Sequence, residues 1–413
     1  MRLRPLRPLV VGAGILVLTN GPLFFVGERL LDGDRGWEEP FTRAVLLAVA
    51  VTATAAVVLD RYRLDGARLA RPHVAAAAPV VFMSAWIVLS SLWSLSPDIA
   101  RGRALIYVGL AAFAWVIADL EFGDFRRALA VASGLGVGAS LVTVALSSSI
   151  GSDINDDWRG IYTNRNSLAP VAGLAILAGL SLWFGSRRGR VWAGMLVGIG
   201  VVAMLGSGSR TAWLALVVAA GASLLLVAAR VGTDRYGPRV RTAAIGIALL
   251  GIAVTSVMVS QLWNESTFVQ RRTIWGLVWD RIGERPLHGF GWFNVWVDPD
   301  FTAADPLLGR GSAHGSFLEV WLGLGLIGLV PFLVIIGLAL YGSLEAAWRR
   351  PSVASWTWLA LVLFLVIENL TESFVLWFSY NWVLLMAAAL RCGAVRRSRV
   401  EHRTPVPSEP ATV

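Results

Sequence analysis

The sequence contains no lysine, a single cysteine and only four histidines among 413 residues. One cysteine excludes an internal disulfide framework, and no cysteine and histidine spacing typical of a structural metal site is present. Because lysine is absent, all of the basic side-chain charge comes from arginine. Together with abundant alanine, glycine and valine, this bias indicates GC-rich coding rather than an arginine-specific function.

Charged residues are also scarce. They make up 15 % of the chain, whereas 56 % of residues are hydrophobic and the mean hydropathy is +0.65. This composition is too apolar for an ordinary soluble protein of this length. The net charge of +9 would suit a nucleic-acid partner, but cytoplasmic loops that follow the positive-inside rule explain it equally well. We predict an all-α integral membrane protein that contacts the lipid bilayer and no nucleic acid.

Long apolar windows recur along the chain, and about 20 such residues suffice to cross the hydrocarbon core. They predict about twelve transmembrane helices, an even number that places both termini on one side. The first window follows a basic segment, as in a signal peptide, but no clear cleavage site follows it, so we interpret it as a first helix. The predicted spans are residues 9–26, 42–60, 74–94, 103–119, 127–148, 168–185, 190–206, 211–230, 242–260, 313–341, 354–370 and 374–390.

Arginine is concentrated in every second connecting segment, for example 61–73 and 230–241. The positive-inside rule places these segments and both termini in the cytoplasm, with the protein in the cytoplasmic (inner) membrane. The connection at about 261–312 then lies outside and is long enough to be a functional candidate. We predict one polytopic membrane domain over residues 1–395, with this large periplasmic loop, and a disordered cytoplasmic tail at 396–413.

The large loop contains the stretch STFVQRRTIWGLVWDRIGERP, whose apolar spacing predicts an amphipathic helix that Pro286 ends. Arg271 falls near the centre of the apolar face, whereas Arg272 lies toward its edge. Arg271 either lies in the first turn and extends to water or lipid phosphate, or it presents its guanidinium to a bound anion. The apolar face consists of Ile274, Trp275, Val278, Trp279 and Ile282.

The stretch GSGSRTAW places Arg210 in a tight outer turn between two predicted spans, where the two glycines permit a close backbone path. Arg210 is either an anchor at the membrane interface or part of a site. The GSGS sequence also allows an intramembrane serine protease, with Ser207 or Ser209 activated by His314. No oxyanion-stabilising or orienting partner for such a protease is identifiable.

The stretch DDWRGIYTNRNSLAP concentrates polar residues before another predicted span. Arginine and asparagine together suit the recognition of hydroxyl and phosphate groups; the alternative is a hydrophilic turn that leads into a helix. The adjacent Asp156 and Asp157 favour a solvated turn over a divalent-cation site, because neighbouring aspartates point apart in most backbones. The candidate substrate-binding residues are Arg159, Asn164, Arg165 and Asn166.

His314 stands in RGSAHGSFLEVWLGLGLIG, where a polar stretch gives way to a long apolar run. As one helix this run would measure about 43 Å, against a hydrocarbon core of about 30 Å. It must therefore tilt, break near one of its glycines or Pro331, or begin above the membrane. The imidazole either caps a helix or acts with Arg210 and Arg271 as a proton acceptor in an outer polar site.

In this order, four motifs resemble those of the O-antigen ligase family, which includes related polysaccharide polymerases and exopolysaccharide proteins. They are the Asn-x-Asn of TNRNSLA, the Ser-Arg turn of GSR, the Arg-x-x-x-Trp of RRTIWGLVWDRIGERPLHGFGWF, and the histidine of AHGSFLEVWLGLGLIG. The resemblance covers about residues 155–335. Each motif is weak alone, whereas their order, spacing and common outer location are specific.

The resemblance implies a bundle of about twelve helices with a large periplasmic loop and a glycosyltransferase-C-like character. It also implies catalysis without a nucleotide sugar, a metal or another cofactor. The family's two key arginines correspond to Arg210 and Arg271, and its histidine to His314, which makes these the predicted catalytic residues. The chain has HG where members often have HN, and its doubled arginine leaves Arg272 as an alternative substrate-binding residue.

The expected reaction transfers a glycan from undecaprenyl diphosphate to an acceptor hydroxyl on the outer face of the membrane. The acceptor is a glycan or glycolipid, such as lipid A core. Planar arginines can hold the leaving diphosphate without a metal, and inversion at the anomeric carbon is the simplest outcome. A polysaccharide polymerase of the same family is an alternative. A transporter or flippase would need ionisable residues near mid-membrane, whereas Glu319, Glu368 and Glu372 are predicted near the outer face.

Overall fold

The computed structural model describes residues 7–26, 74–153, 155–185, 189–235, 266–292, 295–297, 299–303, 311–375 and 379–401. Within these ranges the regular structure is helical, and the one bridge between extended residues joins Ser152 to Trp158. The all-α prediction is therefore confirmed for the described part of the chain. The spans predicted at 42–60 and 242–260 lie outside it.

Seven of the described helices are long and apolar enough to cross a membrane. They are α5 (Pro97–Asp119), α6 (Phe122–Leu146), α8 (Arg165–Gly185), α9 (Arg190–Ser207), α10 (Arg210–Arg235), α14 (Ser316–Arg349) and α15 (Val353–Thr371). Two shorter apolar helices are α1 (Arg7–Leu18) and α4 (Val74–Ser90), and α16 (Tyr380–Glu401) overlaps the span predicted at 374–390. The remaining elements are α2 (Gly21–Phe24), α7 (Ser148–Gly151), α12 (Ser266–Glu284), η3 (Val295–Val297) and α13 (Pro299–Ala303).

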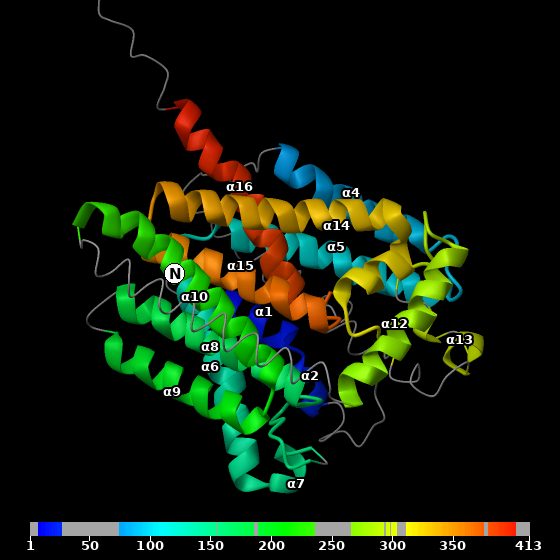
Figure 1. Ribbon diagram of the computed structural model, residues 1–413, viewed down its shortest axis with the longest axis horizontal. Coiled ribbons are helices and arrows are strands. Elements are labelled where there is room, and N and C mark those ends of the chain that lie inside the picture. The colour runs from blue at the N-terminus through cyan, green and yellow to red at the C-terminus, as the bar shows by residue number, and fades with distance from the viewer. Residues whose placement is uncertain are drawn as a thin grey trace, which may run out of the picture.

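The long helices form a bundle with α12 and α13 at one end (Figure 1). Helix α14 packs against α4, α15 and α16, whereas α8 packs against α6, α9 and α15. The first half of α16 lies in the interior, because every residue from Ser379 to Leu390 is buried. A helix that is apolar on all sides is expected at the centre of such a bundle.

The connections predicted to share one side of the membrane lie at the same end of the bundle. At the end that carries α12, the backbone amide of Trp158 donates to the carbonyl of Gly206 at 2.9 Å, which joins the 148–167 connection to the turn between α9 and α10. At the opposite end, Arg391 of α16 donates to the carbonyl of Ala118 at 2.9 Å. The polar connections of the described chain are thereby sorted into two separate sets.

The continuous span predicted at 9–26 is wrong. Helix α1 ends at Leu18, Asn20 has a left-handed backbone with φ of 70°, and the short helix α2 follows. Asparagine adopts this conformation more readily than most residues because its short polar side chain can bond locally. A Cβ on Gly21 would lie 2.5 Å from the ring of Tyr162, so glycine allows this bend to approach the loop before α8.

Helix α14 is broken at Gly325, where φ is 65° and ψ is −171°. The segment that follows α12 enters the break and bonds to the free backbone groups. The amide of Leu326 donates to the carbonyl of Pro286 at 2.9 Å, and the amide of Phe290 donates to the carbonyl of Leu322 at 3.1 Å. Non-helical backbone at membrane depth requires such partners, because no water is available there. The structure thus adopts a break, one of the three predicted solutions for the long run.

Helix α12 confirms the amphipathic helix predicted in the large loop and ends two residues before Pro286. Three residues of the predicted apolar face, Ile274, Val278 and Ile282, are buried. Trp279 of the same apolar face is 53 % exposed and packs edge-on against Trp321 of α14, so this face is buried over only part of its width.

Helix α16 continues past Arg396, where the disordered tail was predicted to begin, and ends at Glu401. Residues 402–413 lie outside the described part of the chain. The helix boundary therefore comes later than the predicted one.

Candidate active site

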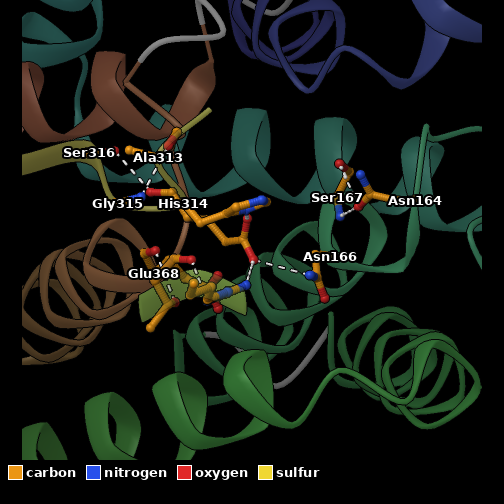
Figure 2. A network of polar contacts seen from close by, with 12 residues as sticks. Asn164, Asn166, Ser167, Ala313, His314, Gly315, Ser316 and Glu368 are labelled. Atoms are coloured by element: carbon orange, nitrogen blue, oxygen red, sulfur yellow. Dashed lines mark hydrogen bonds and ion pairs between the residues drawn. The ribbon is translucent and has the colours of Figure 1, made fainter. Parts of the chain in front are cut away.

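The carboxylate of Glu372 joins residues from three distant segments at the end of the bundle that carries α12. Two of these residues, Asn166 and His314, are labelled in Figure 2. Glu372 follows the last residue of α15. Its Oε1 accepts hydrogen bonds from Nη2 of Arg271 at 2.8 Å and from Nδ2 of Asn166 at 3.1 Å. Its Oε2 lies 3.5 Å from Nδ1 of His314. Three of the predicted site residues thus meet at one acid that was not among them.

Arg271 lies in the second turn of α12, and its side chain is 13 % exposed. In addition to Glu372, it contacts the carbonyl of Thr371, to which Nη1 donates at 2.7 Å. A cation is favoured there because the end of α15 carries partial negative charge. The structure shows Arg271 paired with a protein carboxylate and a helix terminus, rather than extended to water.

The Arg-x-x-x-Trp spacing has a direct structural reason. Trp275 lies one turn after Arg271 on the same face of α12, and its Nε1 donates to the carbonyl of Ala313 at 2.8 Å. Residues four apart on a helix are neighbours. Side chains on one face of α12 therefore donate hydrogen bonds both to Glu372 and to Ala313, the residue before His314.

His314 has a left-handed backbone with φ of 48°, which is uncommon for a residue other than glycine. The amides on both sides of it are hydrogen-bonded: the amide of Ala313 donates to the carboxylate of Glu319, and that of Gly315 donates to Oγ of Ser373 at 3.1 Å. Ser373 in turn donates to Glu319 at 3.0 Å. These bonds stabilise an otherwise unfavourable conformation.

Glu319 lies in the first turn of α14 and is 2 % exposed. Besides Ala313 and Ser373, it accepts a hydrogen bond from Nε1 of Trp296 at 2.8 Å. Trp296 belongs to η3 in the large loop, so Glu319 connects this loop to the segments that carry His314 and Glu372.

The electrostatics of Glu372 favour its ionised form. Burial acts to raise the pKa of Glu372, but its contact with His314 and the positive charge of Arg271 outweigh burial and lower the pKa below its ordinary value. An ionised carboxylate beside Nδ1 can orient the imidazole and favour a proton on that nitrogen. Nε2 is then the nitrogen that can accept a proton.

The two asparagines of the TNRNSLA motif have different contacts. Asn166 links the site to the turn between α9 and α10, because Oγ of Ser209 donates to its Oδ1 at 3.3 Å. Asn164 caps α8: its Oδ1 accepts from the amide of Ser167 at 3.0 Å (Figure 2). The side chain of Asn164 thus has the structural role of a helix cap, although it also lines the cavity described below.

The arginines of the preceding loop stabilise the loop itself. Nε of Arg159 donates to the carbonyl of Ile150 at 3.0 Å, and Arg165 forms an ion pair with Asp157. Neither contact involves Glu372. Arg272 is exposed on α12, on the side away from the buried face.

Arg210 is the first residue of α10 and is exposed. It directly follows Ser209, whose hydroxyl contacts Asn166, so its backbone lies next to the network around Glu372. Ser207 donates instead to the carbonyl of Met204 at 2.8 Å. Both serine hydroxyls of the GSGS stretch thus donate to groups other than His314, which disfavours the serine protease alternative.

A cavity of about 270 Å³ opens beside His314 and Glu372. Its walls come from separate stretches, at 19–20, 162–167, 312–314, 372–374 and 379–380, and are rich in hydroxyl and amide groups. Thr19 and Asn20, from the bend between α1 and α2, and Tyr380 of α16 were not predicted as site residues. They fall inside windows that were interpreted as membrane spans, and only their polarity within an apolar run distinguishes them.

Part of the chain is similar to a known protein family. Residues 195–333 match the family model described as O-Antigen ligase, and no curated protein matches the chain. The matched range contains Arg210, Arg271 and His314, and with them three of the four motifs. Glu372 lies beyond it.

Proposed function

We propose, from the assignment of the chain to the O-antigen ligase family by its residues 195–333, that this protein transfers a glycan from undecaprenyl diphosphate to an acceptor hydroxyl. One observation carries the proposal. Arg271 and His314, from different segments, contact the same carboxylate, that of Glu372, beside a polar cavity. A cation for the leaving group and a base for the nucleophile are the two functions that this reaction needs.

In the proposed reaction the acceptor oxygen bonds to the anomeric carbon as the bond from that carbon to the diphosphate oxygen breaks. The diphosphate leaves with the bonding electron pair, and Arg271 and Arg210 stabilise its negative charge. Arg271 retains unused N–H groups for this purpose, because a guanidinium has five and its two contacts to protein each use one.

The acceptor proton moves to Nε2 of His314 in the same step. Glu372 acts as a positioning residue, because it orients the imidazole from Nδ1 and stabilises its protonated form. Attack on the face opposite the leaving group inverts the anomeric centre. The reaction needs no metal.

We further propose that both termini lie in the cytoplasm and that the site faces the periplasm or the cell exterior. Described arginines of the predicted cytoplasmic side support this orientation, because Arg230 donates to the carbonyl of Trp348 and Arg391 to that of Ala118, at the end of the bundle opposite Glu372. The donor lipid would reach the site from the outer leaflet.

The test is transfer in vitro, with purified protein, a defined undecaprenyl-diphosphate glycan, a panel of acceptors and a chelator present. Arg271→Ala is expected to lower kcat by about 100-fold or more, because removal of one charge-stabilising donor has that effect in other enzymes. The neighbouring Arg272→Ala is the matched control and is expected to retain activity, because Arg272 is exposed on the same helix.

Full activity of Arg271→Ala, Arg210→Ala or His314→Ala would contradict the proposal, as would failure of the wild type to transfer to any acceptor. The same assay separates ligase from polymerase, the second candidate that the family match supports. A ligase makes one product per acceptor, whereas a polymerase extends another lipid-linked repeat.

A further inference from the structure

We infer that the cavity beside His314 binds an uncharged sugar of the acceptor, with the hydroxyl of Tyr380 as a binding group, and that the lipid diphosphate of the donor binds outside it, on the side of Arg210 and Arg271. This inference rests on the proposed function. It assigns the two substrates to different parts of one site.

The charge of the cavity wall is the first argument. Within the described residues no arginine lines the cavity, and its one carboxylate is that of Glu372. A diphosphate placed there would face the carboxylate of Glu372, while the guanidinium of Arg271 that pairs with this carboxylate does not line the wall. A sugar has no such conflict, because the hydroxyl and amide groups of Asn20, Thr163 and Asn166 both donate and accept hydrogen bonds.

The stereochemistry of the reaction is the second argument. In an inverting transfer the nucleophile and the leaving group lie on opposite faces of the anomeric carbon. Both His314 and Arg271 contact Glu372, but His314 lines the cavity whereas Arg271 does not. The side of the base is therefore the side of the acceptor hydroxyl.

Unpartnered buried groups are the third argument. The side chain of Tyr380 is 3 % exposed, and among the described residues its hydroxyl has no hydrogen-bond partner. Neither ring nitrogen of His314 has a hydrogen-bond partner among the described residues, and Nδ1 lies 3.5 Å from the carboxylate of Glu372. Buried polar groups in folded proteins are almost always paired, so two of them on one cavity indicate a ligand with hydroxyl groups.

The size of the cavity agrees with this assignment. Its volume of about 270 Å³ lies just below the range of about 300–1,000 Å³ typical of small-molecule pockets. A space of that size suits a sugar unit and is too small for a polyprenyl chain.

The test uses Tyr380→Phe, which removes one oxygen and keeps the ring. We expect the KM for the acceptor to rise about tenfold, since the loss of one hydrogen bond in a buried site has that order of effect. The KM for the lipid-linked donor and the inhibition constant of free undecaprenyl diphosphate should not change. Arg271→Ala should instead weaken inhibition by undecaprenyl diphosphate.

The matched control is Tyr107→Phe. Tyr107 is a buried tyrosine of α5 whose hydroxyl contacts Sδ of Met83 at 3.8 Å, and it does not line the cavity. This variant should leave both KM values unchanged. Thermal unfolding of Tyr380→Phe should match the wild type, because the hydroxyl that it removes has no described partner.

Three outcomes decide the inference. A raised acceptor KM with unchanged donor KM supports it. An unchanged acceptor KM, or a raised donor KM, overturns it while wild-type transfer still upholds the proposed function. Failure of the wild type to transfer overturns both.

Discussion

His314 is held both through its side chain and through its backbone. Glu372 lies 3.5 Å from the imidazole, and Glu319 and Ser373 bond to the amides on either side of it. The two glutamates therefore have different effects: Glu372 sets the orientation of the ring, and Glu319 stabilises the left-handed backbone. This single histidine therefore depends on two acids, one in the first turn of the helix that follows it and one beyond the end of α15.

The charge of Glu372 can be tested through the pH dependence of stability, with Glu372→Gln. The pKa of Glu372 is lowered in the folded protein from its ordinary value of 4.5. At pH values above 4.5 the ionised carboxylate therefore stabilises the folded protein. This stabilisation is lost as the pH falls through the lower pKa of the folded state. We expect the wild type to unfold at a higher temperature than Glu372→Gln at neutral pH, and the two curves to converge in acid.

The measurement is thermal unfolding in detergent from neutral to strongly acid pH. A difference in Tm that stays constant across that range would show that Glu372 is not ionised in the folded protein. In the transfer assay the same variant is expected to lower kcat, because glutamine cannot stabilise a protonated imidazole.

Sequence reasoning found Arg271, Asn166 and His314 because polar residues stand out where apolar runs begin. It could not find Glu372 as their common partner, because an acid between two predicted spans is also explained by its position near the membrane surface. The contact arises from packing between α8, α12 and α15, which no local pattern encodes.

At the scale of elements, the break in α14 is the feature on which the rest of the outer end depends. The segment after α12 forms four backbone hydrogen bonds with the residues around Gly325, and the guanidinium of Arg281 packs over the ring of Phe290 in that segment at 4.6 Å. The amphipathic pattern and Pro286 predicted the helix and its end. The length of the apolar run at 313–341 shows that it cannot be one straight span. The segment that bonds to its break comes from a distant part of the chain, and no local pattern predicts that contact.

The break makes a prediction about Gly325→Ala. A Cβ at this position would lie 2.2 Å from the carbonyl carbon of Leu287, and φ is 65°. We expect a loss of about 3 kcal/mol or more in unfolding free energy, because strain and a backbone clash combine. Thermal and denaturant unfolding in detergent measure it.

The matched control is Gly337→Ala in the same helix, where a Cβ would meet nothing within 4 Å. Alanine favours a helix interior by about 0.5–1 kcal/mol over glycine, so this variant should be as stable as the wild type or more so. Equal effects of the two substitutions would show that the break does not constrain the fold.

At the scale of the whole molecule, the connections of the described chain fall into two sets at opposite ends. The hydropathy pattern predicted the long apolar helices that the structure describes, whereas the side assigned to each connection from the arginine pattern stays a prediction. The bend at Asn20 was not predicted, because the mean hydropathy of a long apolar window hides a single polar residue within it. That bend supplies part of the cavity wall, so the same averaging concealed part of the candidate site.

The orientation of the molecule can be tested by cysteine labelling in intact cells. Asn155 lies exposed in the connection before α8, and Arg350 lies exposed between α14 and α15. A membrane-impermeant maleimide is expected to label Asn155→Cys from outside, and Arg350→Cys only after permeabilisation. The wild type is the control, because its one cysteine, Cys392, is buried. The reverse pattern of labelling would invert the proposed orientation.

The segment bonded into the break of α14 also limits how the outer end can move. Helix α12, which carries Arg271, leads directly into that segment, and α14 begins two residues after His314. A hinged opening of α12 alone would have to rupture the four main-chain bonds that join the two segments. Turnover should therefore proceed without lid motion between these two helices, with substrates arriving and departing through a fixed aperture.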